Sequence, residues 1–483
     1  MKLKQLLAGV EIICATADMD MEVGGVACDS RKVQSGDLFV AVVGYATDGN
    51  KYIPMAFQKG AAVAVTAVPY EGEGPYVLVR SDRQALAQIG ANFYGHPTTK
   101  MKMIGVTGTN GKTSTTLLLK HVLETVLDAK VGLVGTMENQ IGSQVIPTER
   151  TTPESLELQG LFAQMQTAGC TYAIMEVSSH AIALDRIAGI HYEVCAFTNL
   201  TEDHLDFHKT MEAYGAEKAK LFSRCNKAVI NADDEWAPMM MDGASCPVLT
   251  TAQEKEAALR AENPVLRADG VTFTAVYGDQ KAEVELPIPG KFTVYNALSV
   301  LGIALQLGLP LVDAAKALAT AKGVKGRVEV VPTPNKPYTI LIDYAHTPDG
   351  LYNVLSSVKG YCKGRLIALF GCGGDRDPMK RPIMGKIGTD IADIAILTSD
   401  NPRTEDPGAI LQDVLKGVDE SKKNYVVIEN RPKAIHYAMD IGQKDDIIVL
   451  AGKGHETYQE ICGVKYPMDE RDIVRDYLLE TEK

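Results

Sequence analysis

The nine cysteines of this 483-residue chain are scattered, odd in number and include no C-x-x-C pair. This usage excludes a disulfide framework and is typical of reduced thiols in a cytosol. No apolar run approaches the length of a membrane span, and the start Met1-Lys2-Leu3-Lys4 lacks the apolar region of a secretory signal. We therefore expect a cytoplasmic protein without a membrane span.

The chain also lacks an excess of basic residues. It has 49 Lys and Arg against 61 Asp and Glu, which gives a formal net charge of −12. A surface for duplex nucleic acid is therefore not expected, although local arginines can still hold an anionic small molecule. Internal repeats and low-complexity segments are absent from the sequence. The length is too great for a single hydrophobic core and suggests two to four domains.

Strand-like apolar runs alternate with helical patterns along almost the whole chain, which predicts an α/β protein with mostly parallel sheets. Gly95-His96-Pro97 and the glycine-rich stretch 323–327 are plausible domain boundaries. We expect three domains, a small N-terminal α/β domain (1–98), a central P-loop-type domain (99–327) and a Rossmann-like C-terminal domain (328–483). The expected strands are Tyr172 to Val177, Val194 to Thr198, Ala228 to Asn231, Thr339 to Ile342, Arg365 to Phe370, Ile394 to Thr398, Val426 to Ile428 and Ile447 to Leu450, with an antiparallel stretch near Gly270 to Leu286.

The sequence GVTGTNGKTS at residues 105–114 lies between a buried strand and a helix. Glycines there let backbone N–H groups surround an anion, and the helix N-terminus adds partial positive charge. Lys112 adds a full charge, and the Thr113 hydroxyl can hold Mg²⁺. Val106 stands where the usual loop has its first glycine, so the motif is a variant, Gly108-x-x-Gly111-Lys112-Thr113. We interpret it as a triphosphate-binding loop; a tight turn with an incidental lysine is the alternative.

Acidic residues and histidines follow the next strands of the same predicted sheet. Glu176 ends an apolar run, where a carboxylate suits a Mg²⁺ ligand, the alternative being a solvated or capping residue. Asp203, His204, Asp206 and His208 lie within six residues after the following strand. They lack the thiols or third histidine of a convincing zinc site, and a polar turn is the other alternative.

Lys218 lies on a stretch with amphipathic helical spacing, and the residues alone favour a surface lysine. In the last third, polar loops follow four strands and begin at Asp343, Gly371, Asp400 and Ala451. Ligands bind beyond the carboxyl ends of strands in open α/β sheets, and Arg matches carboxylates bidentately. We expect a site here for a substrate with amino and carboxylate groups, with ordinary turn chemistry as the alternative.

These motifs resemble those of the Mur ligase family along the full chain. Gly-Thr-Asn-Gly-Lys-Thr at 108–113 looks like the family's ATP-binding loop. Asp29-Ser30-Arg31 resembles the UDP-binding segment of the MurE branch, which adds the third residue of the peptidoglycan stem peptide. Within that branch, Asp400-Asn401-Pro402-Arg403 resembles the motif of enzymes that add meso-diaminopimelate, whereas lysine-adding relatives differ here. The resemblance implies that the three domains bind the UDP-sugar, ATP and the amino acid, in that order.

The resemblance also implies roles for individual residues. The implied ATP-binding residues are Gly108, Thr109, Asn110, Gly111, Lys112, Thr113, Ser114, Asn296 at the adenine, and Arg327 and Asp343 at the ribose and phosphates. The implied residues for UDP-N-acetylmuramoyl-L-alanyl-D-glutamate are Ser30, Thr151, Thr152, Ser178 and Arg186. Those for diaminopimelate are Arg376, Asp400, Asn401, Pro402, Arg403, Gly452 and Glu456. The implied metal ligands are Thr113, Glu176, His204 and a carbamylated Lys218, and the implied catalytic residues are Lys112, Lys218, His204 and Glu176.

The chain departs from the family at two places. Arg150 precedes Thr151-Thr152 where relatives often have Asn, and Leu184 stands where some relatives place a polar residue that contacts substrate.

The function implied is an ATP- and Mg²⁺-dependent ligase that adds meso-diaminopimelate to UDP-N-acetylmuramoyl-L-alanyl-D-glutamate, acting as a monomer. A carboxylate is a poor acyl donor, so the γ-phosphate first converts it to an acyl phosphate, which the amine then attacks. Domain closure is expected, because this intermediate must be kept from water. The alternatives are a folylpolyglutamate synthase-like ligase, a P-loop small-molecule kinase and a non-catalytic nucleotide-binding module.

Overall fold

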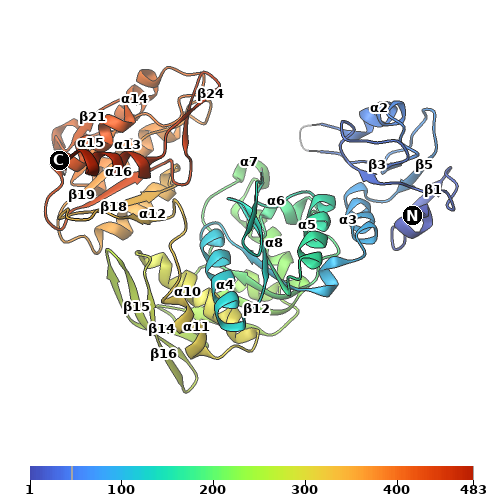
Figure 1. The fold of residues 1–483 in the computed structure, drawn as a ribbon, viewed down its shortest axis with the longest axis horizontal. Helices are drawn as coiled ribbons and strands as arrows, with labels where there is room; N and C mark the ends of the chain where they lie inside the picture. The colour runs from blue at the N-terminus through green and yellow to red at the C-terminus, as the bar shows by residue number, and fades with distance from the viewer. Residues whose placement is uncertain (45–46, 149, 482–483) are drawn as a thin grey trace. The chain divides into compact units, whose positions relative to one another are not determined.

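The structure, a computed structural model, describes residues 1–44, 47–148 and 150–481 (Figure 1). Its three-domain α/β architecture groups into two compact units. The first contains residues 1–260 and 298–314, and the second contains residues 261–297 and 315–483. The domain boundaries expected at residues 98/99 and 327/328 stay predictions.

The N-terminal part of the first unit is a five-stranded sheet in the order β1-β5-β4-β3-β2. Its strands are parallel except for β1, which runs antiparallel to β5. Ser81 caps the last helix of this part by accepting a hydrogen bond from the Gln84 N–H. The elements are α1 Leu3–Leu6, β1 Ile12–Ala15, β2 Val26–Ala27, β3 Leu38–Ala41, α2 Ile53–Gln58, β4 Val63–Thr66, β5 Tyr76–Val79 and α3 Asp82–Phe93.

The rest of the first unit is built on a mostly parallel sheet in the order β13-β12-β11-β6-β10-β7-β8-β9, with β8 and β9 antiparallel. The central strands are near-continuous apolar runs, as expected for strands covered on both faces. The elements are β6 Lys102–Thr107, α4 Lys112–Leu127, β7 Val131–Val134, β8 Asn139–Ile141, β9 Gln144–Ile146, α5 Ser155–Thr167, β10 Tyr172–Glu176, α6 Ser179–Ala183, β11 Tyr192–Phe197, α7 Leu205–His208, α8 Met211–Ala219, β12 Cys225–Asn231, α9 Ala237–Asp242 and β13 Val248–Ala252.

The second unit holds an antiparallel hairpin, β15-β16, and a six-stranded sheet in the order β17-β18-β22-β19-β20-β21. Only β17 is antiparallel in that sheet. The elements are β15 Gly270–Tyr277, β16 Gln280–Leu286, β17 Glu329–Val331, β18 Thr339–Asp343, α12 Pro348–Lys359, β19 Leu366–Phe370, α13 Lys380–Ile391, β20 Ile394–Leu397, α14 Pro407–Leu415, β21 Tyr425–Val427, α15 Arg431–Ile441, β22 Ile447–Ala451, β23 Tyr458–Ile461, β24 Val464–Pro467 and α16 Glu470–Thr481. Three further elements have residues in both units, β14 Leu259–Arg267, α10 Lys291–Gln306 and α11 Leu311–Leu318.

Helices cover both faces of the six-stranded sheet, because alternate residues of each strand enter different cores. Leu341 packs with side chains of α12, α13 and α14, such as Leu351 and Met384. Ile340 packs instead with side chains of α15 and α16, such as Ala434. This two-sided burial explains why the strand positions were predictable from apolar runs alone. The expected strands and the antiparallel stretch are confirmed to within three residues at each end, the largest difference being at the start of β12.

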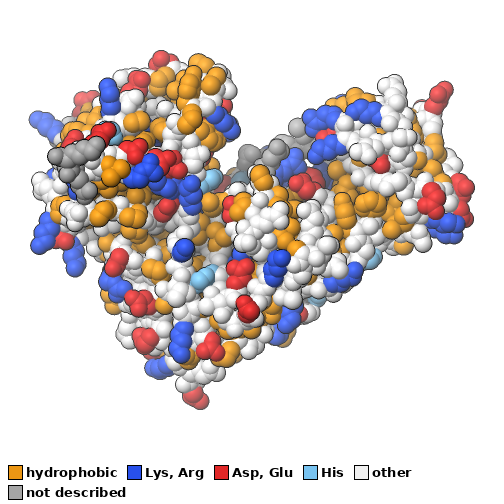
Figure 2. Space-filling model, viewed as in Figure 1, with side chains coloured by type: hydrophobic (Ala, Val, Ile, Leu, Met, Phe, Trp, Pro, Cys, Tyr) orange, Lys and Arg blue, Asp and Glu red, His pale blue; other side chains and the backbone are white. Residues whose placement is uncertain are grey.

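Charges of both signs are interspersed on the face of the molecule shown in Figure 2. Among the described residues, no helix has the length and apolar character needed to cross a membrane.

A buried aspartate fixes one corner of the second unit. The Asp446 carboxylate forms an ion pair with the Arg365 Nη2 at 2.6 Å. It also accepts hydrogen bonds from the backbone N–H groups of Arg365 and Gln443 at 2.7 and 2.8 Å. Burial alone would raise the pKa of Asp446, but these donors outweigh it and lower the pKa below its usual value. The corner therefore depends on an ionised carboxylate.

We predict that Asp446→Asn lowers the free energy of unfolding by roughly 2–3 kcal/mol, since Arg365 is partly exposed and its charge is screened. A lowered pKa stabilises the fold above the unfolded-state pKa of about 4, and this contribution is lost as pH falls through the folded-state value. The deficit of the variant should thus be constant near neutrality and shrink below about pH 4. Urea denaturation at several pH values measures it, with exposed Asp445→Asn as the control; equal stabilities of the two variants would contradict the assignment.

Candidate functional site

The phosphate loop lies between β6 and α4 and depends on two glycines with positive φ, Gly108 at 145° and Gly111 at 84°. A Cβ atom on Gly108 would overlap the Thr198 Oγ1. Only glycine, which has no Cβ, therefore lets the backbone pass this close to Thr198. Helix α4 begins without a side-chain cap, which leaves its first N–H groups available to an anion. The loop therefore has the geometry of a phosphate-binding site.

Residues after β11 hold this loop in place. The Thr198 hydroxyl donates to the Asn110 carbonyl at 2.6 Å, and the Asn110 N–H donates to the Asn199 Oδ1 at 2.9 Å. The Thr109 N–H donates to the Asn199 carbonyl at 2.8 Å. Sequence reasoning assigned no role to Thr198 and Asn199, although their place at the end of the neighbouring strand was a usable signal. Their hydrogen bonds fix the path of the loop.

Two lysines donate to the same carbonyl of the loop. The Lys112 Nζ lies 3.0 Å from the Gly108 carbonyl and 2.9 Å from the Thr109 carbonyl. The Lys218 Nζ lies 2.9 Å from the same Gly108 oxygen. Burial first, and the Lys112 charge second, lower the pKa of Lys218 well below its usual value. Lys218 is therefore predisposed to be a neutral amine.

The interpretation of Lys218 as a surface lysine is wrong, because only 1% of the residue is exposed. Its Nζ lies over the Tyr214 ring, 4.6 Å from the ring centre. The Tyr214 hydroxyl is 3.2 Å from the Thr109 Oγ1, and burial raises the pKa of this phenol to about 12. Helix α8 therefore turns its lysine inward against the phosphate loop.

Glu176, the last residue of β10, is buried and receives three hydrogen bonds. The Thr113 Oγ1 and the Thr136 N–H donate to its Oε1, and the Thr136 Oγ1 donates to its Oε2, each at 2.9 Å. The donor set fits Mg²⁺, because hard carboxylate and hydroxyl oxygens converge beside a phosphate loop. Thr136 follows β7, and sequence reasoning missed it because a lone threonine after an apolar strand carries no motif.

The two predicted histidines, His204 and His208, differ in their exposure to solvent and in their hydrogen-bond partners. His204 is exposed, with φ of 54°, and its Nε2 lies 3.4 Å from the Asp203 carboxylate. His208 is buried and bonds to the Ser179 Oγ at 2.8 Å, and burial together with His180 lowers its pKa to about 4. Among the described residues, no three His, Cys, Asp or Glu side chains converge as a metal site. The side chain of Asp206 lies outside what the structure describes, and the metal role of His204 stays a prediction.

The residues predicted for the dipeptide substrate gather beside Glu176. The Thr136 Oγ1, whose hydrogen is donated to Glu176, lies 3.1 Å from the Thr151 hydroxyl and can accept its hydrogen. The Thr152 hydroxyl donates to the Glu176 carbonyl at 2.9 Å and lies 3.4 Å from the Ser178 Oγ. The structure thus brings Thr151, Thr152 and Ser178 to the magnesium-binding candidate.

Arg186 completes this group, because its Nη1 donates to the Thr152 carbonyl at 3.1 Å while its Nη2 pairs with Glu154 at 2.8 Å. Of the two departures, Arg150 pairs with the same Glu154 at 3.3 Å, and the Leu184 carbonyl accepts from Arg83 at 3.2 Å.

Ser30 belongs to the N-terminal sheet region. It is buried between Asp29 and Arg31, whose side chains pair at 2.8 Å. No hydrogen bond described in the structure joins Ser30 to the Thr151 group. Its contact with the uridine diphosphate stays a prediction.

Two of the nucleotide residues expected in the second unit, Asp343 and Arg327, lie at or near the end of β18. The Asp343 carboxylate accepts from the N–H groups of Val328 and Ala345, both at 2.8 Å, and burial raises its pKa. The Arg327 guanidinium lies over the Tyr344 ring, 5.1 Å from its centre. Asn296 is buried on α10. Their contacts with ATP stay predictions.

The loop Asp400-Asn401-Pro402-Arg403 meets the loop after β22. The Asn401 Nδ2 donates to the Glu456 Oε2 at 2.9 Å. Gly452 has φ of 115°, and a Cβ there would lie 2.6 Å from the Asp400 Oδ2. The predicted amino-acid-binding residues of these two loops are therefore brought together.

Two arginines complete this region. The Arg403 Nη1 donates to the Gly374 carbonyl at 2.6 Å, and its Nε lies 3.5 Å from Glu460. The N–H of Gly374 in turn donates to the Asn401 carbonyl, and a Cβ on Gly374 would overlap the Pro402 carbonyl. Arg376 is exposed and donates to the Asp375 carbonyl at 3.1 Å. Both guanidinium groups lie beside these loops, and among the described residues neither forms an ion pair within the hydrophobic core.

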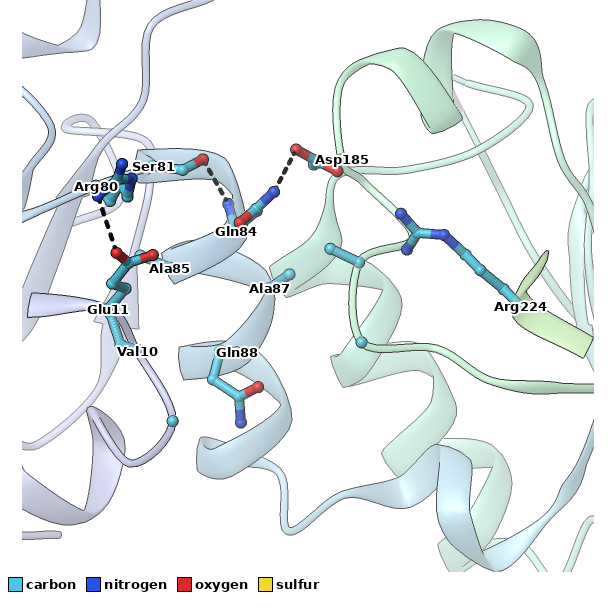
Figure 3. Close-up of a pocket in the computed structure, with 13 residues that line it drawn as sticks. Val10, Glu11, Arg80, Ser81, Gln84, Ala85, Ala87, Gln88, Asp185 and Arg224 are labelled. Carbon is cyan, nitrogen blue, oxygen red and sulfur yellow. Dashed lines mark hydrogen bonds and ion pairs between the residues drawn. The ribbon is translucent and has the colours of Figure 1, made fainter. Parts of the chain in front are cut away.

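A cavity of about 370 Å³ lies elsewhere in the first unit, and none of the predicted site residues lines it. Figure 3 shows Gln84 of α3 pointing toward Asp185, with which it forms a hydrogen bond of 3.3 Å. An exposed pair between Arg80 and Glu11 borders the same cavity. Nothing in this lining resembles the chemistry of the phosphate loop.

Comparison with known proteins matches three family descriptions to the chain. Residues 22–94 match the Mur ligase family catalytic domain, residues 106–304 the Mur ligase middle domain, and residues 326–454 the Mur ligase glutamate ligase domain. A UDP-N-acetylmuramoyl-L-alanyl-D-glutamate--2,6-diaminopimelate ligase of Caldanaerobacter subterraneus subsp. tengcongensis is 47% identical over 100% of both chains.

Solved structures agree with these matches. One titled UDP-N-acetylmuramoyl-L-alanyl-D-glutamate--2,6-diaminopimelate ligase has a TM-score of 0.75 and 32% identity, and covers 100% of this chain and 99% of its own. A Mycobacterium tuberculosis folylpolyglutamate synthase shares only the fold, with a TM-score of 0.62, 17% identity and coverage of 83% and 95%. The full-length relatives and the three matched domains confirm the resemblance seen in the motifs: the chain belongs to the Mur ligase family.

Proposed function

We propose that this chain is an ATP-dependent ligase that joins meso-diaminopimelate to the D-glutamate γ-carboxylate of UDP-N-acetylmuramoyl-L-alanyl-D-glutamate. The observation that carries the proposal is the 47% identity, over the full length of both chains, with a ligase of that name. The phosphate loop, the threonine-rich group beside Glu176 and the Asn401–Glu456 pair supply sites for the three substrates. We further propose that it requires Mg²⁺ and acts as a monomer in the cytoplasm.

The proposed reaction has two steps, phosphoryl transfer and attack by the amine. An oxygen of the γ-carboxylate attacks the γ-phosphorus of ATP, the bond to the β-phosphate oxygen breaks, and ADP and an acyl phosphate form. The amine of diaminopimelate then attacks the acyl carbon, the carbon–oxygen bond to phosphate breaks, and the amine loses a proton. The amide and free phosphate are the products.

The chain's own residues bind and orient these groups. The N–H groups of the loop and of the α4 N-terminus bind phosphate oxygens, and Lys112 exchanges its bonds to the Gly108 and Thr109 carbonyls for bonds to phosphate. Thr113 and Glu176 would hold Mg²⁺, with His204 and a carbamylated Lys218 as the further predicted ligands. When bound, the ion neutralises charge on the transferring phosphoryl group.

One experiment distinguishes the proposed ligase from the two alternative enzymes. A P-loop kinase would release a stable phosphorylated product without an amine, whereas the proposed ligase releases phosphate only when the amine is present. Phosphate release should therefore be measured with UDP-N-acetylmuramoyl-L-alanyl-D-glutamate, ATP and a panel of amino acids. Release with diaminopimelate is expected, and release with glutamate on a folate substrate would favour a folylpolyglutamate synthase-like enzyme.

Thr136 supplies a prediction because its hydroxyl joins Glu176 to Thr151. We expect Thr136→Val to lower kcat by about 10- to 100-fold, since a hydrogen bond to a charged group contributes roughly 1.5–3 kcal/mol. Thr136→Ser, which retains the hydroxyl, should keep most of the activity. Steady-state kinetics with both variants measure this, and similar rates for Val and Ser would show that the hydroxyl has no part in turnover.

Lys218 supplies a second prediction. Its lowered pKa makes it a nucleophilic amine, and a carbamate would offer Mg²⁺ an anionic oxygen where an ammonium would repel it. Lys218→Ala should lose activity and regain part of it with added short carboxylic acids. Lys220→Ala, at an exposed lysine of the following turn, is the control. An inactive variant that no carboxylic acid restores would count against the carbamate.

Arg403 supplies a third prediction, because diaminopimelate differs from lysine by one distal carboxylate. Arg403→Ala would remove the guanidinium proposed to pair with this carboxylate. Breaking such a desolvated charge pair costs roughly 2–5 kcal/mol, so kcat/KM for diaminopimelate should fall by about 30- to several-thousand-fold. Lysine should be a poor substrate and lose little further with Arg403→Ala. If Arg403→Ala used diaminopimelate within about threefold of the unaltered enzyme, Arg403 would not select the substrate.

A further inference from the structure

Lys453 is a buried cation that has no part in the proposed function described so far. It follows β22 in the sequence Ala451-Gly452-Lys453, and its side chain has no exposed surface. Its Nζ donates to the Asn401 Oδ1 at 2.7 Å and to the Glu456 Oε2 at 2.7 Å. The ammonium also lies 5.2 Å from the centre of the Tyr458 ring. Lys453 therefore joins the two residues proposed to contact the amino acid.

These contacts determine which way the Asn401 amide points. An ammonium is only a donor, so the amide oxygen must face Lys453. The Glu460 N–H donates to the same oxygen at 2.9 Å, which agrees with this orientation. The amide NH₂ group consequently faces Glu456, to which it gives one of its two hydrogens. Asn401 can therefore offer a ligand a donor but not an acceptor.

The same contacts engage one of the two oxygens of Glu456. Its Oε2 accepts hydrogen bonds from both the Lys453 ammonium and the Asn401 amide. Within the described part of the chain, Oε1 takes no hydrogen bond, so it remains an acceptor for a ligand. An amide donor and a carboxylate acceptor side by side match the carboxylate and ammonium groups of one amino-acid centre.

We propose that Lys453 is a positioning residue for the amino-acid substrate, which fixes the Asn401 amide as a donor and the Glu456 carboxylate as an acceptor at one amino-acid centre. The inference rests on the proposed function of these loops as the diaminopimelate site. The loop carrying Lys453 is itself held in place, because the buried Arg431 Nη2 donates to the Ala451 carbonyl at 2.8 Å and its Nε to Glu470 at 2.8 Å. Lys453 therefore acts from a fixed backbone.

The chain offers a matched control in Lys465 of β24. Its ammonium lies over the same Tyr458 ring, 4.3 Å from the centre, but it is exposed and makes no described contact with Asn401 or Glu456. Lys453→Met and Lys465→Met thus remove the same charge and the same ring contact. They differ in the two hydrogen bonds on which the proposal depends.

The experiment is a steady-state comparison of both variants with each substrate varied in turn. Lys453→Met should raise the KM for diaminopimelate on the order of 10- to 100-fold, while the KM values for ATP and the UDP-dipeptide change less than about twofold. Lys465→Met should leave all three unchanged. Lys453→Gln, which retains an N–H donor, should give an intermediate KM and keeps the test available if the Met variant does not fold. Equal effects on all three KM values, or none on diaminopimelate, would overturn the proposal.

A double-mutant cycle separates positioning from general stability. If Lys453 acts through Asn401 and Glu456, Lys453→Met should add less than about threefold in a background of Asn401→Ala and Glu456→Gln. A full additional loss in that background would overturn the proposal. If Asn401→Ala itself leaves the KM for diaminopimelate unchanged, the proposed amino-acid site fails. If it raises that KM while Lys453→Met and Lys453→Gln do not, only the role of Lys453 fails.

Discussion

The side-chain nitrogens of two lysines, Lys112 and Lys218, donate to one backbone oxygen, the carbonyl of Gly108. Two positive charges that share one acceptor would repel each other, and this repulsion is among the causes that lower the pKa of Lys218, after burial. Lys218 is fully buried, so it cannot relieve this repulsion by turning to solvent. The repulsion is relieved when Lys218 is neutral, or when anionic groups enter beside Lys112. The phosphate loop thus favours an anion between its two lysines. Glu176 and Thr136 lie at adjacent strand ends, and Thr113 lies in the first turn of α4.

The carboxyl ends of the parallel strands determine where these groups meet. Glu176 pairs in register with Val106 of β6, and Phe197 of β11 pairs with Thr107, so the residues that follow lie around the phosphate loop. In the second unit, Asp343 pairs with Ala451 in the same way. Each unit therefore collects its polar residues at one edge of a sheet whose strands are otherwise apolar, which is why short polar loops after apolar runs were informative.

The sequence predicted the phosphate loop, the strand ends and the family, because each is encoded in local patterns of glycine, charge and apolar residues. It could not predict that Lys218 is buried, since amphipathic spacing does not show which face of α8 meets the loop. It also gave no signal for Thr136 or Lys453, whose importance arises from contacts with residues 40 and 52 positions away. Such contacts depend on strand order and register, which a single sequence does not show directly.

The proposed activation of a carboxylate by phosphoryl transfer is tested most directly by oxygen labelling. The D-glutamate γ-carboxylate of the UDP-dipeptide would carry ¹⁸O, and the phosphate released with diaminopimelate would be analysed by mass spectrometry. Passage through an acyl phosphate predicts that each phosphate carries one oxygen from the carboxylate, because the carbon–oxygen bond breaks when the amine attacks. Formation of the amide with unlabelled phosphate would contradict the account.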